Sequence, residues 1–308
     1  MHRSLRRCRA RRPRSNLRGH RGRRPAPCQP RKHLRQPQAR LSSVELDLKG
    51  RSILVTGGSG GIGSIVAEQF AREGANVTIA ARVRERLEQT KAEIASRAGV
   101  DVRITEMDVT DAESIASAVQ SVLDSAGRID AVISSAVDVV GALPGSPSEL
   151  DVTSLGNAID VKVLGILRLA QSVVPHMKAS RYGRIIGVGG ASSRQVGSAS
   201  ASVRNSALAA LCKNMATELG PHGITVNVIH PGAVLTERNR PRVEAEMERN
   251  GGTFEEAEAR MATAIPVGRM IHPEDIGALA MLLASPAGGA ITGQTIAVDG
   301  GSTTAITY

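Results

Sequence analysis

The sequence predicts an α/β fold: a single doubly wound parallel sheet of about seven strands with helices on both faces. Short apolar runs typical of buried strands alternate with helical segments along most of the chain. A cluster of glycines lies where the first of these strands meets its helix. The composition permits a substantial core, because 41% of the 308 residues are hydrophobic.

The expected elements follow one another without a linker after residue 50. We expect strands at residues 52–55, 76–80, 102–105, 131–134, 184–188, 225–229 and 295–298. We expect helices at residues 62–73, 84–97 and 112–124, two more before residue 184, and another that ends near Leu219. Steady alternation of this kind is typical of parallel sheets covered on both faces, so one domain is expected over residues 45–308.

The glycine cluster lies in residues 51–63, which read RSILVTGGSGGIG. Glycines permit a tight turn and close approach of the backbone to a phosphate, and Gly63 lets the next helix pack against the strand. The first turn of that helix also offers unpaired N–H groups to an anion. The spacing is GxxxGxG rather than GxGxxG, but the strand before it and the helix after it favour a dinucleotide site. A strand-to-helix turn without a ligand is the alternative.

The end of the second strand indicates which dinucleotide is preferred. Ala81 stands where an NAD-specific fold would place an acid for the ribose hydroxyls, and Arg82 follows it. A guanidinium pairs with a 2′-phosphate, which a carboxylate would repel. The sequence therefore favours NADP(H), with NAD(H) as the alternative. Arg82 as an ordinary solvated residue is the competing interpretation, since Arg84 and Arg86 lie nearby.

The net charge of +10 comes from the amino-terminal segment. Residues 1–44 hold 14 Arg, one Lys and no acid, which leaves 24 basic and 29 acidic residues in the rest of the chain. Five prolines and the lack of apolar periodicity predict a disordered tail. Three interpretations stay open: a nucleic-acid-binding arm, an organellar presequence, or a start of translation after the tail, for example at Val44.

Membrane spans, disulfides and metals are not expected. No run of about 18 apolar residues is present. The three cysteines at positions 8, 28 and 212 form neither a disulfide framework nor a metal-ligand spacing. We therefore expect a cytoplasmic protein without a metal site.

Three stretches resemble the short-chain dehydrogenase/reductase family: TGGSGGIG, the MDVTD turn at Asp108, and HPGAVLTE. The resemblance covers nearly all of residues 46–301, and the closing segment from IPVGRM to IAVDGG strengthens it. It implies a seven-stranded Rossmann-like sheet, a homodimer or homotetramer, and hydride transfer between a nicotinamide cofactor and a small alcohol or carbonyl compound. The cofactor contacts that it implies are Thr56, Gly57, Ser59, Gly61, Ile62, Gly63, Arg82, Asp108, Val109, Ala136, Pro231, Gly232 and Thr236.

The catalytic half of the sequence departs from the family pattern. The family's NNAG stretch reads SSAV at residues 134–137. The family's helix asparagine falls on Lys162, its serine on Gly190, and the tyrosine and lysine of YxxxK on Ala201 and Asn205. In the family the tyrosine transfers the proton, with its pKa lowered by the nearby ammonium. An alanine has no proton to transfer.

Other residues are candidates for the missing chemistry. Lys162 begins an apolar helix face that runs to Val173, so its ammonium is expected to seek a wet cleft or a partner. Desolvation there would lower its pKa toward usefulness as an acid or base. The alternative is a stem that packs while the head reaches solvent. Ser192 and Ser193 follow Gly190 in a shortened loop, where either is a candidate for the serine's place.

Two further features bear on the site. Residues 237–263 are expected to form two charged helices separated by Gly251 and Gly252, either as a hinged lid or as a solvated excursion. His230 directly precedes the PG dipeptide, close to the expected nicotinamide, whereas His272 is expected only to begin a helix.

Two functions of different classes therefore stay open. The first is an oxidoreductase with a rearranged acid/base set. The second is a catalytically silent dinucleotide-binding sensor or assembly subunit. Nucleic-acid binding depends only on the basic tail.

Overall fold

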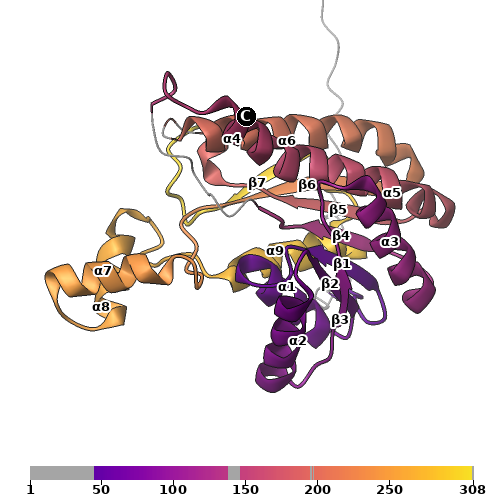
Figure 1. Ribbon diagram of the computed structural model, residues 1–308, viewed down its shortest axis with the longest axis horizontal. Coiled ribbons are helices and arrows are strands. Elements are labelled where there is room, and N and C mark those ends of the chain that lie inside the picture. Colours follow the sequence, from indigo (N-terminus) through magenta and orange to yellow (C-terminus); the bar gives the residue numbers. More distant parts are fainter. Residues whose placement is uncertain (1–44, 138–145, 195, 197, 307–308) are drawn as a thin grey trace, which may run out of the picture. The chain divides into compact units, whose positions relative to one another are not determined.

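Seven parallel strands form the central sheet of the residues that the computed structural model describes, 45–137, 146–194, 196 and 198–306 (Figure 1). Their spatial order is β3-β2-β1-β4-β5-β6-β7, and every neighbouring pair is parallel. The strands are β1 (Ser52–Thr56), β2 (Asn76–Ala81), β3 (Arg103–Glu106), β4 (Ala131–Ser134), β5 (Gly183–Val188), β6 (Ile224–Pro231) and β7 (Thr295–Val298). The expected doubly wound sheet is confirmed.

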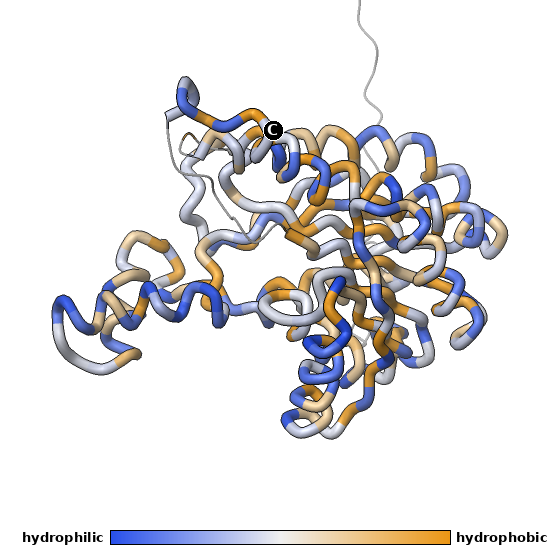
Figure 2. The backbone as a smooth tube through the Cα atoms, viewed as in Figure 1, coloured by the Kyte–Doolittle hydropathy of each residue, from blue (hydrophilic) through white to orange (hydrophobic). Residues whose placement is uncertain are grey.

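Helices cover both faces of this sheet. The helices of the described residues are α1 (Gly61–Arg72), α2 (Arg84–Ala98), α3 (Ala112–Ala126), α4 (Val152–Ile159), α5 (Gly165–Ser180), α6 (Ala199–Leu219), α7 (Arg240–Asn250), α8 (Phe254–Met261) and α9 (Pro273–Ala284). Helices α1, α2 and α9 share one apolar core with the sheet, and α3, α5 and α6 share the other. Figure 2 shows hydrophobic residues concentrated in the strands and hydrophilic residues along α2 and α7. A membrane-crossing helix is not found in the described part of the chain.

The strands form where the sequence places short apolar runs. All five residues of β1 and all eight of β6 are buried, as expected for parallel strands that helices cover on both sides. The observed third strand begins at Arg103, one residue later than the sequence predicts. The tail at residues 1–44 lies outside the described residues.

Local capping groups set the helix ends. Asp111 caps α3 by accepting a hydrogen bond from the backbone of Glu113. Gly99 and Gly127 end α2 and α3 in the left-handed conformation. These ends direct each connection toward the next strand.

The neighbouring strands β1 and β4 pair in parallel, and the strand order reverses between them. From β1 the sheet continues to β2 and β3 on one side, and from β4 it continues to β5, β6 and β7 on the other. In this register Thr56, at the end of β1, is the partner of Ser134, at the end of β4. The loops after these two strands therefore diverge and leave a crevice at their carboxyl ends. This is the place where open α/β sheets bind ligands.

Residues 240–261 form the two charged helices expected there, α7 and α8, which Figure 1 shows apart from the helix layers of the sheet. Gly251 and Gly252 separate them and adopt φ values of 71° and 91°. Their small apolar core comprises Val243, Ala257, Ala262, Ile265 and Met270. Whether the pair acts as a lid stays a prediction.

Candidate functional site

The loop between β1 and α1 has a backbone that only glycine fits at two positions. Gly57 has a φ of 67°, and a Cβ there would lie 2.8 Å from the backbone nitrogen of Ala136. A Cβ on Gly63 would overlap the carbonyl oxygen of Gly57. The glycines thus let the loops after β1 and β4 touch and bring the first turn of α1 to the crevice.

A cavity of about 960 Å³, here called the central cavity, opens at the carboxyl ends of the strands. All the expected cofactor residues line it except Gly63, which lies behind Gly57: Thr56, Gly57, Ser59, Gly61, Ile62, Arg82, Asp108, Val109, Ala136, Pro231, Gly232 and Thr236. Its volume lies at the upper end of the range for ligand sites. The residues present fit a dinucleotide, because a glycine loop and a helix amino terminus face a cavity at the point of strand reversal.

Charged groups lie at the β2–β3 end of the central cavity. Asp108 accepts hydrogen bonds from the Thr110 backbone at 2.9 Å and from the Thr110 hydroxyl at 2.7 Å. Burial raises the pKa of Asp108, but these bonds and the charges of Arg82 and Arg168 outweigh it, so the pKa lies below its ordinary value. The exposed Arg82 side chain therefore stands beside a carboxylate at the rim of the central cavity.

Lys162 lies in a π-helical turn, Asp160–Leu164, between α4 and α5. The side chain lines the central cavity and its residue is only 6% exposed. Its Nζ donates a hydrogen bond to the carbonyl oxygen of Ala136 at 3.1 Å. Burial lowers the pKa of Lys162 to about 7, and the charge of Arg204 contributes to the shift. The ammonium head thus turns into the protein rather than out to solvent.

Ser192 and Ser193 lie in a short 3-10 helix, Ala191–Arg194, and are not among the residues that line the central cavity. The Ser192 hydroxyl accepts a hydrogen bond from the Asn205 amide at 3.3 Å. The Ser193 hydroxyl is buried and has no hydrogen-bond partner within the described ranges. Both serines are held against α6, because Ser202 and Ser206 donate to their carbonyl oxygens at 2.8 and 3.3 Å.

Gly190 lines the central cavity, and the Asn205 side chain fills the space beside it. A Cβ on Gly190 would lie 3.0 Å from the Asn205 amide nitrogen, a tight contact. Asn205 is 3% exposed and Ala201 is 5% exposed, and neither lines the central cavity. The Asn205 amide therefore occupies the space that a side chain at position 190 would need.

His230 is completely buried at the end of β6. Its Nδ1 accepts a hydrogen bond from the Gly190 backbone at 3.0 Å, and any side chain on Gly189 would overlap the ring. His230 thus holds the loop after β5 rather than lining the central cavity. His272 precedes α9, as expected, and also lines the cavity.

Sequence reasoning missed part of the cavity wall. Ser135, Val188 and Gly189 come from the ends of β4 and β5, and the direct signal for them is their place at or just after the end of a predicted strand. The segment Glu237–Asn239, before α7, also lines the cavity. Its first residue, Glu237, ends the HPGAVLTE stretch, and the segment opens residues 237–263, where two charged helices are expected.

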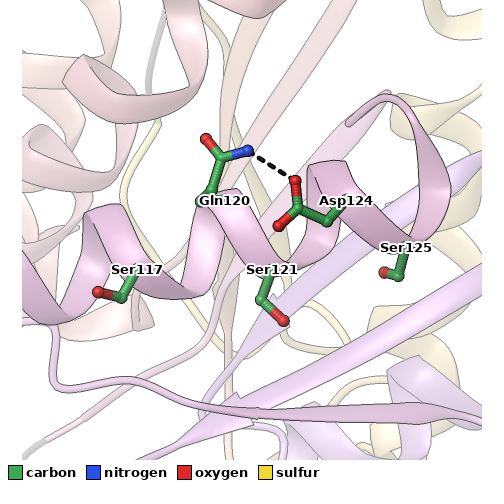
Figure 3. Close-up of a pocket in the computed structure, with 5 residues that line it drawn as sticks. All are labelled: Ser117, Gln120, Ser121, Asp124 and Ser125. Carbon is green, nitrogen blue, oxygen red and sulfur yellow. Dashed lines mark hydrogen bonds between the residues drawn. The ribbon is translucent and has the colours of Figure 1, made fainter.

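A second hollow, of about 560 Å³, runs along α3 (Figure 3). It is lined by Ser117, Gln120, Ser121, Asp124 and Ser125. All five come from the exposed side of one helix, where Gln120 donates to Asp124 at 2.8 Å. No motif leads to this surface, and its polar groups do not converge. Groups of three or more potential metal ligands are not found among the described residues.

Comparison with known proteins gives a consistent family. The protein-family model described as enoyl-(acyl carrier protein) reductase matches residues 57–303 of this chain. The short-chain reductase protein NovJ of Streptomyces niveus is 34% identical over 267 residues, 84% of this chain and 97% of NovJ. The NADPH-dependent reductase BacG of Bacillus subtilis is 31% identical over 255 residues, 82% of this chain and 97% of BacG.

Solved structures agree with these relatives. L-sorbose reductase from Gluconobacter frateurii, in complex with NADPH and L-sorbose, superposes with a TM-score of 0.76 at 28% identity and covers 85% of this chain and 99% of that one. The sheet order, the glycine loop and the sequence matches point to one family. The chain belongs to the short-chain dehydrogenase/reductase family of NAD(P)-dependent oxidoreductases.

Proposed function

We propose that the protein transfers a hydride between NADP(H) and a small alcohol or carbonyl compound with a rearranged acid/base set, in which Lys162 handles the proton. The observation that carries this proposal is the position of Lys162, buried on the wall of the central cavity with its pKa lowered to about 7. An acid/base works best when its pKa lies near the operating pH.

The preference for NADP(H) has two supports. Arg82 lines the central cavity directly after β2, where Ala81 leaves no carboxylate to repel a 2′-phosphate. The relative BacG is an NADPH-dependent reductase, and L-sorbose reductase was solved with NADPH. NAD(H) is the weaker candidate.

The residues divide the work along the central cavity. Bound NADP(H) would supply or accept the hydride. The glycine loop at Gly57 and Gly61 would hold the pyrophosphate, and Asp108 would hold the adenosine end. Pro231, Gly232 and Thr236, which line the same cavity as Lys162, would hold the nicotinamide end.

Lys162 would donate a proton to the substrate oxygen during reduction and take one during oxidation. By the family resemblance, Gly190, Ala201 and Asn205 stand where the usual serine, tyrosine and lysine would, and none of the three can transfer a proton at neutral pH. Ser192 and Ser193 follow Gly190 in the chain and are proposed to bind the substrate oxygen, although neither lines the central cavity in this structure.

NADPH oxidation with a panel of small carbonyl compounds tests the role of Lys162. Lys162→Met is expected to lower kcat by roughly 100-fold or more. Lys162→Arg is expected to lower kcat to a similar extent, because a guanidinium does not release its proton. Lys178→Met removes a half-buried lysine that does not line the central cavity and serves as the matched control. Full activity of Lys162→Met would contradict the proposal.

A catalytically silent dinucleotide-binding protein is the second candidate. The contacts of Tyr182 favour it, because they engage the hydroxyl of this tyrosine outside the central cavity. The Tyr182 hydroxyl donates to the Ala284 carbonyl oxygen at 2.9 Å, and its ring lies 4.4 and 4.1 Å from the guanidinium carbons of Arg51 and Arg184. Burial raises its pKa. Tyr182 therefore does not line the central cavity, and its hydroxyl is engaged by Ala284. NADPH binding without turnover on any tested carbonyl would support the silent protein.

We also propose a homo-oligomer. Leu164 and Val203 are 40% and 46% exposed on the π-helical turn and on α6, two elements in contact. Apolar side chains gathered on neighbouring helices favour a subunit interface. Light scattering is expected to show a dimer or tetramer, and Val203→Glu is expected to dissociate it.

A further inference from the structure

The Lys162 amine has the placement of a nucleophile as well as that of a proton carrier. It lies in a π-helical turn, a feature that widens the helix and recurs at functional sites. The residue is 6% exposed, yet it lines a cavity large enough for a small organic molecule. A reactant in the central cavity would thus meet the amine away from bulk water.

The surroundings of Lys162 disfavour its charged form. Among the residues that the structure describes, no carboxylate lies within ion-pairing distance of its Nζ, and the neighbouring Asp160 pairs instead with Arg168 at 2.7 Å. Arg204 adds a second positive charge nearby. A desolvated lysine beside another cation is one of the settings in which lysine acts as an amine nucleophile.

One hydrogen bond fixes the nitrogen without using its lone pair. Nζ donates an N–H to the Ala136 carbonyl oxygen at 3.1 Å. A neutral amine that donates in this way keeps its lone pair for attack on an electrophile. Ala136 also lines the central cavity, so the bond orients the amine at the cavity wall.

We propose that Lys162 forms a covalent imine with small aldehydes that enter the central cavity. The Nζ lone pair attacks the carbonyl carbon to give a carbinolamine. Its hydroxyl then leaves with a proton as water, and the second N–H proton is lost as the C=N bond forms. The carbonyl oxygen and both amine protons thus end in one water molecule, and nothing is oxidised or reduced. This reactivity goes beyond the proposed hydride transfer and does not require a dinucleotide.

The other described lysines differ from Lys162 in burial. They are exposed or half-buried, and none lines the central cavity: Lys49, Lys91, Lys178 and Lys213. Lys91 and Lys178 also lie beside carboxylates, at 3.0 Å from Asp101 and 3.8 Å from Glu218, unlike Lys162. The reaction is therefore selective for one position.

The test traps the imine on the full chain. The protein is incubated at neutral pH, without dinucleotide, with butanal or formaldehyde and sodium cyanoborohydride, which reduces an imine to a stable secondary amine. Proteolysis and mass spectrometry then locate the adduct. At short times the Lys162 peptide is expected to carry the adduct at a level roughly tenfold above that of the Lys178 peptide.

Two variants test whether the fast adduct requires the amine at position 162. Lys162→Arg keeps the positive charge but has no reactive amine, and it is expected to lose the fast adduct. Lys178→Arg is the control outside the central cavity and is expected to keep the fast adduct. Labelling of Lys162 no faster than that of Lys178 with both aldehydes overturns the proposal. The wild-type peptide map gives this result even if a variant does not fold, and failure of NADPH turnover does not affect it.

Discussion

Lys162 is a cation that the fold buries at an energetic cost. The ordinary pKa of 10.5 falls to about 7 in the folded chain because burial disfavours the charged form and Arg204 adds to the effect. The unfolded chain, with the ordinary pKa, therefore binds one more proton than the folded chain between these values. Stability due to this group rises with pH across that interval and is lowest below pH about 7. A purely structural residue would not be expected to carry this cost.

Lys162→Met is expected to raise the free energy of unfolding at neutral pH by on the order of a few kcal/mol. The gain is expected to shrink by about 1.4 kcal/mol per pH unit between pH about 7 and 10, because the wild-type amine loses its proton in the folded state first. Urea unfolding of both proteins across this range gives the difference. Parallel pH profiles would show that the folded amine keeps an ordinary pKa.

We propose that the choice of dinucleotide depends on Arg82. Arg82→Ala is expected to weaken NADPH binding by roughly tenfold and to leave NADH binding nearly unchanged, because only NADPH carries the 2′-phosphate. Arg84→Ala is the matched control: Arg84 is exposed, pairs with Glu88 at 3.0 Å and does not line the central cavity. Equal losses for both cofactors in Arg82→Ala would contradict this role.

At the scale of elements, the β1–α1 connection was predictable because its signal is local. A buried apolar run followed by GGSGGIG requires a strand, a left-handed turn and a helix amino terminus in that order. Gly57 and Gly61 adopt positive φ values, and Gly63 packs against the carbonyl of Gly57. The sequence of this loop alone therefore predicts that its expected cofactor residues lie together, whatever the rest of the fold.

The π-helical turn and the loop after β5 were not predictable in the same way. Apolar spacing around Lys162 indicates a helix but does not distinguish a π turn, which depends on tertiary contacts such as the bond from Nζ to Ala136. Loop length alone predicts Ser192 or Ser193 in the place of the missing serine. In the structure, contacts with α6, including the Asn205 amide, hold them away from the cavity lining.

Gly57→Ala and Gly99→Ala form a matched pair that tests the glycine loop. Both glycines have a φ of 67°, so alanine strains the backbone equally, at about 1–2 kcal/mol. A Cβ at Gly99 meets open space, whereas one at Gly57 meets the backbone of Ala136. Gly57→Ala is therefore expected to lose NADPH binding and Gly99→Ala to keep it, as measured by nicotinamide fluorescence. Normal NADPH binding by Gly57→Ala would argue against the proposed pyrophosphate cradle.

At the scale of the whole molecule, the described elements belong to one unit, residues 43–308. We propose that this unit binds the cofactor alone. A chain without residues 1–44 is expected to keep its NADPH affinity and its Tm. Salt-dependent retention on heparin is expected to disappear, because the removed segment holds 14 Arg and one Lys. A marked loss of NADPH affinity on deletion would instead assign the basic segment to the cofactor site.

We propose that the cavity at the point of strand reversal holds NADP(H). The most direct measurement is a titration of the protein with NADPH and, separately, NADH, followed by nicotinamide fluorescence. We expect saturable binding of both, with NADPH the tighter because Arg82 lines the cavity directly after β2. Binding of neither dinucleotide would exclude both the proposed oxidoreductase and the silent dinucleotide-binding protein.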